Sequence, residues 1–493
     1  MRMTRRGLLA TVWATGVAAA CTTGPGIFGD GSAGPDATEM AAMIKRGDIS
    51  SAEAVETAIK RADLVQPKIN FMVNDTYALA RARAKTAIAG PFAGVPTLVK
   101  DLNDVIGART RLGSRITEKV PPATEESAYI KAFLGTGVVC IGKSAAPENG
   151  YLPTTEPLAF GPTRNPWNTN YSTAGSSGGA AAAVATGVVP MAHANDGGGS
   201  IRFPAANCGL VGLKPSRGRL IDEQPGARPL DLSVQGCVSH TVRDTARLLA
   251  ATEFGAGVSA YAPVGLVEGP GSKKLKVGVI TRGFAGNDAD LEVAAIVRNA
   301  AKVLQGQGHE VSDTSWPTAP TFGDDFLAFW SLGAAQDVQT GAKLIGRQPD
   351  ERDLEPFTLR MAQNAGALTP ADIQAIQARL MKAAADYNTW IKQFDIVLSP
   401  VFSSPPSPLG FLRGDVPFDE LRARLLNEVG YTLIHNISGA PGISLPLGWS
   451  KSGLPVGVQV MGANGAERVL LETAYLFEAE MPWIGKRPGV WVG

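Results

Sequence analysis

Residues 172–220 read STAGSSGGAAAAVATGVVPMAHANDGGGSIRFPAANCGLVGLKPSRGRL, and the rest of the chain is interpreted around this stretch. Two of its serines stand among glycines, Ser176 in GSSGG and Ser200 in DGGGSIR. The apolar run between them, residues 180–194, is mostly alanine and contains Gly187 and Pro190. We expect this run to form one buried element and not a membrane span, because it is too short and too interrupted.

The two glycine-rich motifs predict a hydrolytic site. Glycine lets the backbone approach a ligand closely and point its N–H groups at it. A serine at the end of such a run can attack a carbonyl whose oxygen those N–H groups stabilise. A phosphate-binding loop would need a lysine and then Ser or Thr after its last glycine, but Ala180 follows Gly179.

The segment GSSGG also fits the G-x-S-x-G nucleophile elbow of α/β-hydrolases, with Ser177 as the nucleophile. That reading needs a catalytic histidine, and we expect all four histidines to be structural because each lies in apolar or turn surroundings: His193, His240, His309 and His435. A serine hydrolase without a histidine can use a neutral lysine whose pKa is lowered by burial. The candidate is Lys100, at the end of the apolar segment GVPTLVKD.

Four motifs in a fixed order carry a resemblance to a known family. They are GVPTLVKD at 94–101, GPTRNPWN at 161–168, GSSGG at 175–179 and DGGGSIRFPA at 196–205. Together they resemble the amidase signature family, and the likeness extends from about Thr38 to the last helix. The resemblance implies one large α/β domain with a mixed, twisted β-sheet covered by helices on both faces.

The same resemblance implies a Ser-cisSer-Lys triad. Ser200 would be the nucleophile, and Ser176, after a cis peptide bond, would relay its proton to Lys100. The backbone N–H groups of the DGGGS motif would form the oxyanion hole: Gly197, Gly198, Gly199 and Ser200. The implied reaction is amide hydrolysis through an acyl-enzyme, with no metal and no organic cofactor.

Three further residues of the motifs are expected to support the site. Asp196 and Arg202 flank the nucleophile with opposite charges, and we expect them to pair with each other or with the backbone. Ser177 is expected to hydrogen-bond nearby and steady its turn. Many family members have Thr where Gly197 stands, so glycine there leaves more room beside the oxyanion hole. The DGGGS form resembles a branch that includes hydrolases of cyclic nylon-oligomer amides.

Length and charge exclude some classes of protein. The chain has 493 residues, 44% of them hydrophobic, enough for one large domain. Its 46 basic and 45 acidic residues give a net charge of +1, with no basic stripe outside the extreme N-terminus, so we expect no nucleic-acid partner. No Cys and His spacing typical of a zinc site occurs. Three cysteines are expected to be buried thiols, although an exported protein could pair two of them: Cys140, Cys208 and Cys237.

The first residues predict export. Residues 1–20 contain Arg5-Arg6, an apolar run and a final Ala-Ala-Ala, which resembles a twin-arginine signal. Cys21 leaves a lipid anchor open, so the enzyme is expected to be periplasmic or tethered to a membrane. Residues 21–35 are rich in Gly and Pro and predict a linker.

The catalytic domain is expected to occupy residues 36–493. The sequence predicts helices at 38–45, 51 onward, 75–89, 244–249, 291–304, 324–330, 371–394 and 467–480. Residues 275–395 are expected to be the variable part that shapes the substrate pocket. Three aromatic residues there are candidate pocket walls or plain core: Phe326, Phe329 and Trp330.

Three function classes remain open at this point. An exported hydrolase of small-molecule amides is favoured, and the same triad could act on esters, carbamates or cyclic oligoamides. An amidotransferase subunit working on charged tRNA is disfavoured by the export signal. A binding protein that keeps only the fold is disfavoured by the presence of all three triad residues. The sequence leaves the substrate and the oligomeric state open.

Overall fold

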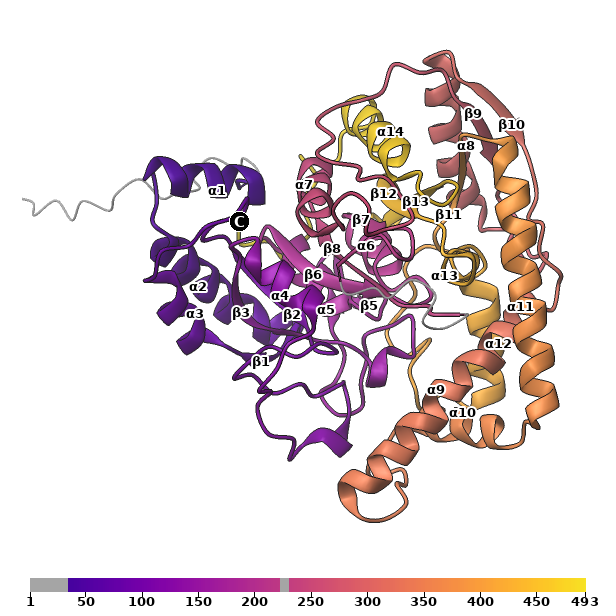
Figure 1. The fold of residues 1–493 in the computed structure, drawn as a ribbon, viewed down its shortest axis with the longest axis horizontal. Coiled ribbons are helices and arrows are strands. Elements are labelled where there is room, and N and C mark those ends of the chain that lie inside the picture. The colour runs from indigo at the N-terminus through magenta and orange to yellow at the C-terminus, as the bar shows by residue number, and fades with distance from the viewer. Residues whose placement is uncertain (1–33, 222–229) are drawn as a thin grey trace, which may run out of the picture.

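The computed structural model describes residues 34–221 and 230–493, drawn in Figure 1. The predicted export signal, Cys21 and the linker up to residue 33 lie outside the described residues. The first helix, α1, spans Ala37–Arg46 and is capped by the side chain of Asp36. The predicted start of the folded domain at residue 36 therefore coincides with a helix cap.

The central feature is an eight-stranded mixed sheet with the order β10-β9-β11-β13-β12-β7-β8-β6. β9 pairs in parallel with β10 and β11, and the remaining neighbours are antiparallel. The strands are β6 Met191–Asp196, β7 Val211–Lys214, β8 Val234–Ser239, β9 Lys276–Val279, β10 Glu310–Asp313, β11 Ile396–Pro400, β12 Gly442–Trp449 and β13 Pro455–Met461. The mixed sheet confirms the predicted fold class.

Helices cover both faces of this sheet, as predicted (Figure 1). The side chains of β11 alternate between the two faces, as the twofold period of a strand requires. Ile396 and Leu398 belong to the core under α8 and α14, whereas Val397 belongs to the core under α11 and α13. The helices concerned are α8 Leu291–Gly306, α11 Pro370–Trp390, α13 Leu433–Ser438 and α14 Glu467–Glu480.

A second sheet holds the strand that ends at Lys100. β2, Pro96–Lys100, pairs in parallel with β3, Val139–Ser144, which pairs antiparallel with β1, Met72–Asp75. The Thr97 hydroxyl donates to the Met191 carbonyl of β6 over 2.9 Å, so β2 lies against the edge of the large sheet. A short hairpin of β4, Arg164–Asn165, and β5, Asn168–Ser172, completes the described strands.

The alanine-rich run is buried as expected, but it forms two elements instead of one. Helix α5, Gly178–Ala185, is buried along its whole length, and β6 follows it. Between them Gly187 has φ +80°, a left-handed conformation that glycine adopts at no steric cost, and Pro190 cannot continue a helix. This turn sends β6 back toward Lys100 and places residues 197–200 at its end.

Most helix predictions are confirmed, but two helices have other bounds and several helices were not predicted. The Ser50–Glu53 capping box opens α2, Ser51–Ile69, and α14 has the predicted bounds. The helix predicted at 75–89 is only Tyr77–Ala84 (α3), because Asp75 pairs within β1. The helix predicted at 324–330 extends to Phe322–Ile345 (α9), since no proline interrupts it. α10, Pro356–Gly366, and α12, Phe418–Glu428, were not predicted.

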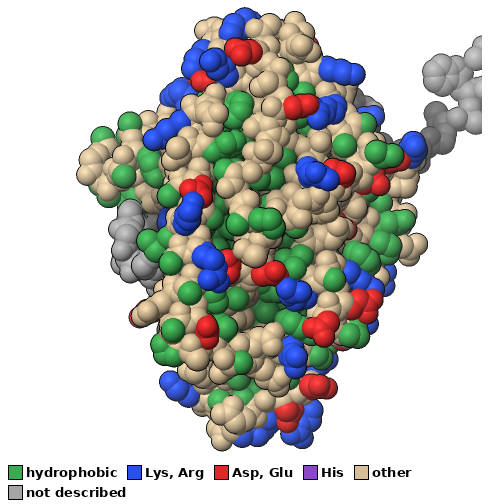
Figure 2. Space-filling view, turned by 90° about the vertical axis from the view of Figure 1, so that its right-hand side faces the viewer, with side chains coloured by type: hydrophobic (Ala, Val, Ile, Leu, Met, Phe, Trp, Pro, Cys, Tyr) green, Lys and Arg blue, Asp and Glu red, His purple; other side chains and the backbone are tan. Residues whose placement is uncertain are grey.

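The remaining helices are short. They are α4 Ala128–Gly135, α6 Arg202–Cys208 and α7 Val242–Thr252, with 3-10 turns at Arg115–Thr117, Glu148–Gly150 and Ile391–Gln393. Among the residues that the structure describes, no helix is both long and apolar enough to span a membrane. Figure 2 shows basic, acidic and apolar side chains interspersed over the face that carries the later helices. Cys140, Cys208 and Cys237 are unpaired thiols.

Candidate active site

Lys100 ends β2 with its side chain fully buried. Its Nζ lies 2.7 Å from the Oγ of Ser176, and 2.6 Å and 3.4 Å from the Oδ1 and main-chain oxygen of Asn195. Burial lowers the pKa of Lys100 well below its ordinary value, and the nearby charge of Asp196 only partly opposes this. A lysine in this setting can be a neutral amine at neutral pH and can accept a proton.

Ser176 follows a cis peptide bond from Gly175, in the segment that leads into α5. A Cβ built on Gly175 would lie 2.4 Å from the Thr154 carbonyl oxygen, so only glycine fits against that backbone. Ser176 is almost fully buried. The two serine loops meet here, because the N–H of Ser177 donates to the carbonyl of Ser200 over 3.3 Å.

Ser200 lies in the wall of an apolar pocket. The pocket holds about 560 Å³ of empty space, its open mouth included. The lining residues are Gly150, Tyr151, Leu152, Pro153, Gly198, Ser200, Phe203, Gly323, Phe326, Leu327, Trp330, Phe357, Leu425, Leu426, Val429 and Leu433. None of these carries a charge, so the pocket fits an uncharged apolar group next to a serine hydroxyl.

The loop of residues 197–200 is named the nucleophile loop after the predicted role of Ser200, and three of its four N–H groups have no hydrogen-bond acceptor among the residues that the structure describes. No hydrogen bond of the described residues uses the backbone N–H of Gly197, Gly198 or Ser200. The N–H of Gly199 instead donates to Oδ1 of Asp196 over 2.7 Å. The expectation that Gly199 supplies an oxyanion donor therefore does not fit this structure, since a carboxylate already binds that N–H.

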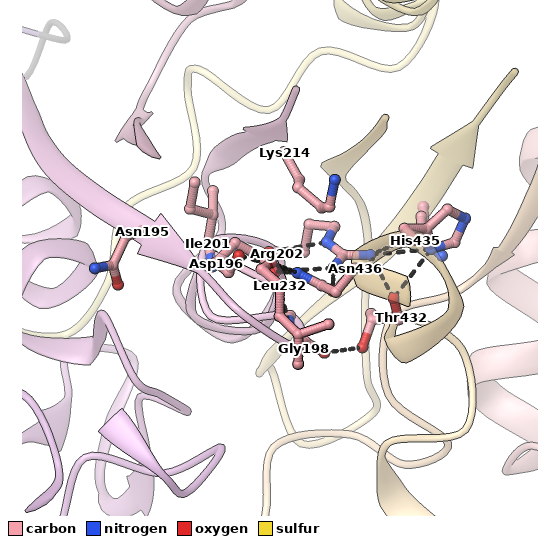
Figure 3. A network of polar contacts seen from close by, with 12 residues as sticks. Asn195, Asp196, Gly198, Ile201, Arg202, Lys214, Leu232, Thr432, His435 and Asn436 are labelled. Carbon is pink, nitrogen blue, oxygen red and sulfur yellow. Dashed lines mark hydrogen bonds and ion pairs between the residues drawn. The ribbon is translucent and has the colours of Figure 1, made fainter. Parts of the chain in front are cut away.

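Asp196 and Arg202 form a buried ion pair that holds the nucleophile loop from both ends. Arg202 donates to both carboxylate oxygens of Asp196 over 2.9 Å. Burial alone would raise the pKa of Asp196, but the guanidinium of Arg202 holds it well below its usual range. Figure 3 shows Arg202 reaching on its other side to Thr432, His435 and Asn436.

Ser177 lies deeper than the other two serines. It is fully buried, its Oγ donates to the Asn195 carbonyl over 3.3 Å, and it does not line the pocket. No hydrogen bond in the described part of the chain joins a histidine to Ser176, Ser177 or Ser200. The G-x-S-x-G elbow with Ser177 as nucleophile therefore lacks both access and a base.

His193 serves the site as a structural residue. Its Nδ1 accepts the backbone N–H of Lys100 over 3.2 Å, and its Nε2 lies 3.0 Å from the side-chain oxygen of Gln235. This arrangement selects the neutral ring with its proton on Nε2. Burial lowers the pKa of His193 to about 3, so the ring stays neutral and adds no charge beside Lys100.

Asn195 was not singled out by the sequence. It follows His193 by two positions on β6, so both side chains project from the same face of that strand toward β2. Its Nδ2 donates to Oδ1 of Asn103 over 3.2 Å, which fixes the amide so that its oxygen faces Lys100. The two-residue spacing of His193 and Asn195, just before the glycines of the loop, was the signal that could have identified Asn195.

Two of the three candidate aromatic residues line the pocket, and the third belongs to the core. Phe326 and Trp330 line the pocket and stack with ring centroids 5.6 Å apart, while Phe329 packs in the core behind them. A Cβ built on Gly197 would lie 2.9 Å from Cη2 of Trp330. The room that glycine leaves at position 197 is therefore filled by an indole ring.

The parts of the chain that the structure describes contain no group of three or more His, Cys, Asp or Glu side chains suited to a metal ion. The polar groups around Ser200 are instead hydroxyls, amides, a lysine and backbone N–H groups.

Comparison with known proteins agrees with this geometry. The family model described as Amidase matches residues 53–471. A Mycobacterium leprae protein named "Putative amidase AmiC" is 38% identical over 463 residues, covering 92% of this chain and 97% of that protein. The 6-aminohexanoate-cyclic-dimer hydrolase of a Pseudomonas species is 36% identical over 480 residues, covering 92% and 96%.

Solved structures give the same result. A 6-aminohexanoate cyclic dimer hydrolase complexed with substrate superposes with a TM-score of 0.85 at 32% identity, covering 93% of this chain and 99% of that one. A bacterial aryl acylamidase of the amidase signature family superposes with a TM-score of 0.81 at 26% identity, covering 92% and 99%. This chain belongs to the amidase signature family and is a hydrolase of carbon–nitrogen amide bonds.

Proposed function

We propose that Ser200 is the nucleophile of this amidase, that Ser176 relays its proton, and that neutral Lys100 is the base. One observation carries the proposal: the buried Lys100 Nζ lies 2.7 Å from Ser176 Oγ, in the loop that touches Ser200. The apolar pocket beside Ser200 supports the same assignment, because a substrate carbonyl can reach the hydroxyl from there.

The contacts of Lys100 match the hydrogens of a neutral amine. Such an amine has two hydrogens and one lone pair. The two oxygens of Asn195 can accept the two hydrogens, and the lone pair can then accept the hydroxyl proton of Ser176. Ser176 is thereby ready to take a proton from Ser200 while it gives its own to Lys100.

The proposed reaction proceeds in two halves. Ser200 Oγ attacks the amide carbon, and its proton passes through Ser176 to Lys100. The carbonyl oxygen becomes an oxyanion near the unused N–H groups of Gly197, Gly198 and Ser200. The relay then protonates the amine as the C–N bond breaks. Water, deprotonated through the same relay, attacks the acyl-enzyme and releases the carboxylic acid.

The substrates are proposed to be small-molecule amides with an uncharged apolar part. The absence of charge from the described pocket lining supports this class. The relatives named for a cyclic dimer of 6-aminohexanoate and for acylamides support both cyclic oligoamides and linear acyl amides as candidates. Esters and carbamates contain the same attackable carbonyl and are secondary candidates.

The mechanism is tested by intact-protein mass spectrometry with a panel of amides, anilides, esters and carbamates. An acyl adduct on the peptide that carries Ser200 is expected, and it should be absent from Ser200→Ala. Lys100→Ala should lose activity nearly as completely, because loss of a triad member typically costs about a thousandfold or more. Ser177→Ala is the matched control. More than about a tenth of the normal rate in Ser200→Ala or Lys100→Ala would contradict the mechanism.

Export through a twin-arginine signal is proposed separately. It rests on Arg5-Arg6, the apolar run after them and the small residues before Cys21. The full chain expressed in a bacterium with twin-arginine transport should appear in the periplasmic or membrane fraction. The double variant Arg5→Lys/Arg6→Lys should remain inside the cell, and equal export of both proteins would refute the proposal. Lipidation at Cys21 should be lost in Cys21→Ala.

A further inference from the structure

The apolar pocket beside Ser200 has a neighbouring cleft. The cleft lies between α9, α10 and α12 and also holds about 560 Å³ of empty space, its mouth included. It is lined by Asp324, Leu327, Ala328, Ser331, Met361, Asn364, Leu368, Phe418 and Arg422. Leu327 is the one residue that lines both the pocket and the cleft. Its side chain therefore stands where the two spaces adjoin.

The two spaces differ in chemistry. The side chains that line the pocket are apolar, aromatic or hydroxyl-bearing. The cleft contains the Asp324–Arg422 ion pair together with Ser331 and Asn364. A chain that fills the pocket from Ser200 outward would thus remain in an apolar environment up to Leu327 and meet polar groups beyond it.

The other residues between the two spaces are packed more tightly than Leu327. Phe357 on the pocket side stacks against Phe418 on the cleft side, with ring centroids 5.8 Å apart. Phe357 is buried in the cluster that also contains Met361 and Leu421. Leu327 is only half-buried at the margin of that cluster. Shortening Leu327 would connect the two spaces and leave the aromatic stack in place.

We propose that Leu327 is a specificity-determining residue that sets the longest apolar chain an amide substrate can place in the pocket. This inference rests on the proposed function, because it measures length from Ser200. Each methylene that leaves water for the pocket should raise kcat/KM roughly fourfold. The rise should stop when the chain end reaches Leu327, since further atoms meet the leucine side chain.

The test uses two series of substrates. In the first, the 4-nitroanilide leaving group is constant and the straight acyl chain lengthens from acetyl to dodecanoyl. In the second, the acetyl group is constant and the straight alkylamine lengthens from propylamine to dodecylamine. The series that shows the length optimum identifies which part of the amide occupies the pocket, and kcat/KM is measured for every member.

Two opposite changes at Leu327 are compared with wild type. Leu327→Ala should move the optimum to longer chains, with a gain of tenfold or more on the longest substrates, because it opens the path into the cleft. Leu327→Phe should move the optimum to shorter chains. The control is Leu425→Ala, which removes the same volume from the pocket wall away from the cleft, and it should not extend the optimum.

The outcomes separate this inference from the mechanism. An unchanged optimum in both Leu327 variants, in both series, would overturn it. A shift of Leu425→Ala equal to that of Leu327→Ala would also overturn it, because volume alone would then explain the effect. Leu327→Phe keeps the wall filled, so it decides the question even if Leu327→Ala fails to fold. Retained turnover in Ser200→Ala would instead refute the proposed nucleophile, whatever the length profile.

Discussion

Asn195 controls the orientation of the Lys100 amine. Its Oδ1 is 2.6 Å from Lys100 Nζ, and its own amide is held by Asn103. A carbonyl oxygen at this distance binds an ammonium more strongly than a neutral amine. The amide therefore favours the ammonium form, whereas burial lowers the pKa of Lys100 well below its ordinary value. Asn195 is a positioning residue whose effect should be visible in the pH dependence of the reaction.

Opposite substitutions at Asn195 should move the acidic limb of kcat/KM in opposite directions. In the proposed mechanism the active form of Lys100 is the neutral amine, so activity should fall as the pH drops through the pKa of Lys100. Asn195→Asp places a carboxylate beside the amine, favours the ammonium and should move the limb to higher pH by about one unit or more. Asn195→Ala removes the acceptor and should move the limb to lower pH, with a loss in kcat from poorer positioning.

The measurement is a pH profile of kcat/KM for wild type and both variants on one uncharged substrate. Ser177→Ala is the control, since its Oγ donates to the main-chain oxygen of Asn195 and, among the described residues, has no hydrogen bond to Lys100 or to the Asn195 side chain. Shifts in the same direction for Asp and Ala at position 195 would show that the limb does not report Lys100.

At the residue scale, the sequence singled out the proposed triad more readily than the residues that hold it in place. Lys100, Ser176 and Ser200 lie in glycine-rich or strand-end motifs whose residue types limit what they can do, and the structure brings their segments together. Gly199 was misjudged because the glycine run gives no sign of which N–H the Asp196 carboxylate takes. Asn195 was missed because an amide before an Asp-Gly pair is typical of a turn.

At the scale of elements, the nucleophile loop and helix α9 share one packing contact. Gly197 has no positive φ, so its backbone would accept a side chain, but Trp330 of α9 occupies that space. Trp330 is held by stacking on Phe326 and by a hydrogen bond from its indole N–H to the Tyr151 carbonyl at 3.3 Å. The effects of substitutions at positions 197 and 330 on activity should therefore be non-additive.

Gly197→Ala should lower kcat/KM by roughly tenfold or more, because the methyl group must displace either the indole or the N–H donors beside Ser200. Trp330→Leu should restore most of this loss when combined with Gly197→Ala. The expected coupling is about 1–3 kcal/mol in a double-mutant cycle on one amide substrate. Phe329→Leu, on the same helix but outside the pocket, is the control and should not rescue. Additive losses at positions 197 and 330 would contradict the coupling.

Elements with strong local signals were predicted, and those that depend on tertiary packing were not. The capping box of α2 and the apolar face of α14 are each formed by residues close together in the sequence, so they can be recognised from the sequence alone. α9 extends far past its predicted end. It contains Gly341, where Ile116 packs into the space that a side chain would fill, so a contact distant in sequence explains the glycine. α10 and α12 bury one face in a cluster shared with α9 and with loop residues such as Leu152 and Leu412, so this cluster becomes apparent only in three dimensions.

At the scale of the whole molecule, one polar network joins segments far apart in the sequence. Arg202 contacts Asp196 before the nucleophile loop, Asn436 on α13 and Gln459 on β13. Asn436 also donates to the main chain of Asp196 and of Leu232. The buried guanidinium thus connects both halves of the large sheet at the point where the chemistry is proposed, which is why the loop geometry depends on the complete fold.

Arg202→Met should destabilise the protein by about 3–5 kcal/mol, since it leaves Asp196 buried and without its cation. The double variant Asp196→Asn/Arg202→Met should recover part of that stability, because position 196 no longer holds a buried carboxylate without its guanidinium. It should still be poorly active, since the loop loses its anchor. Urea unfolding and kcat/KM measured on the same samples would separate the two effects. Arg46→Gln, which breaks only exposed pairs with Glu39 and Asp48, is the control and should cost at most about 1 kcal/mol. A double variant as unstable as Arg202→Met would mean that the lost hydrogen bonds to α13 and β13 outweigh the unpaired charge.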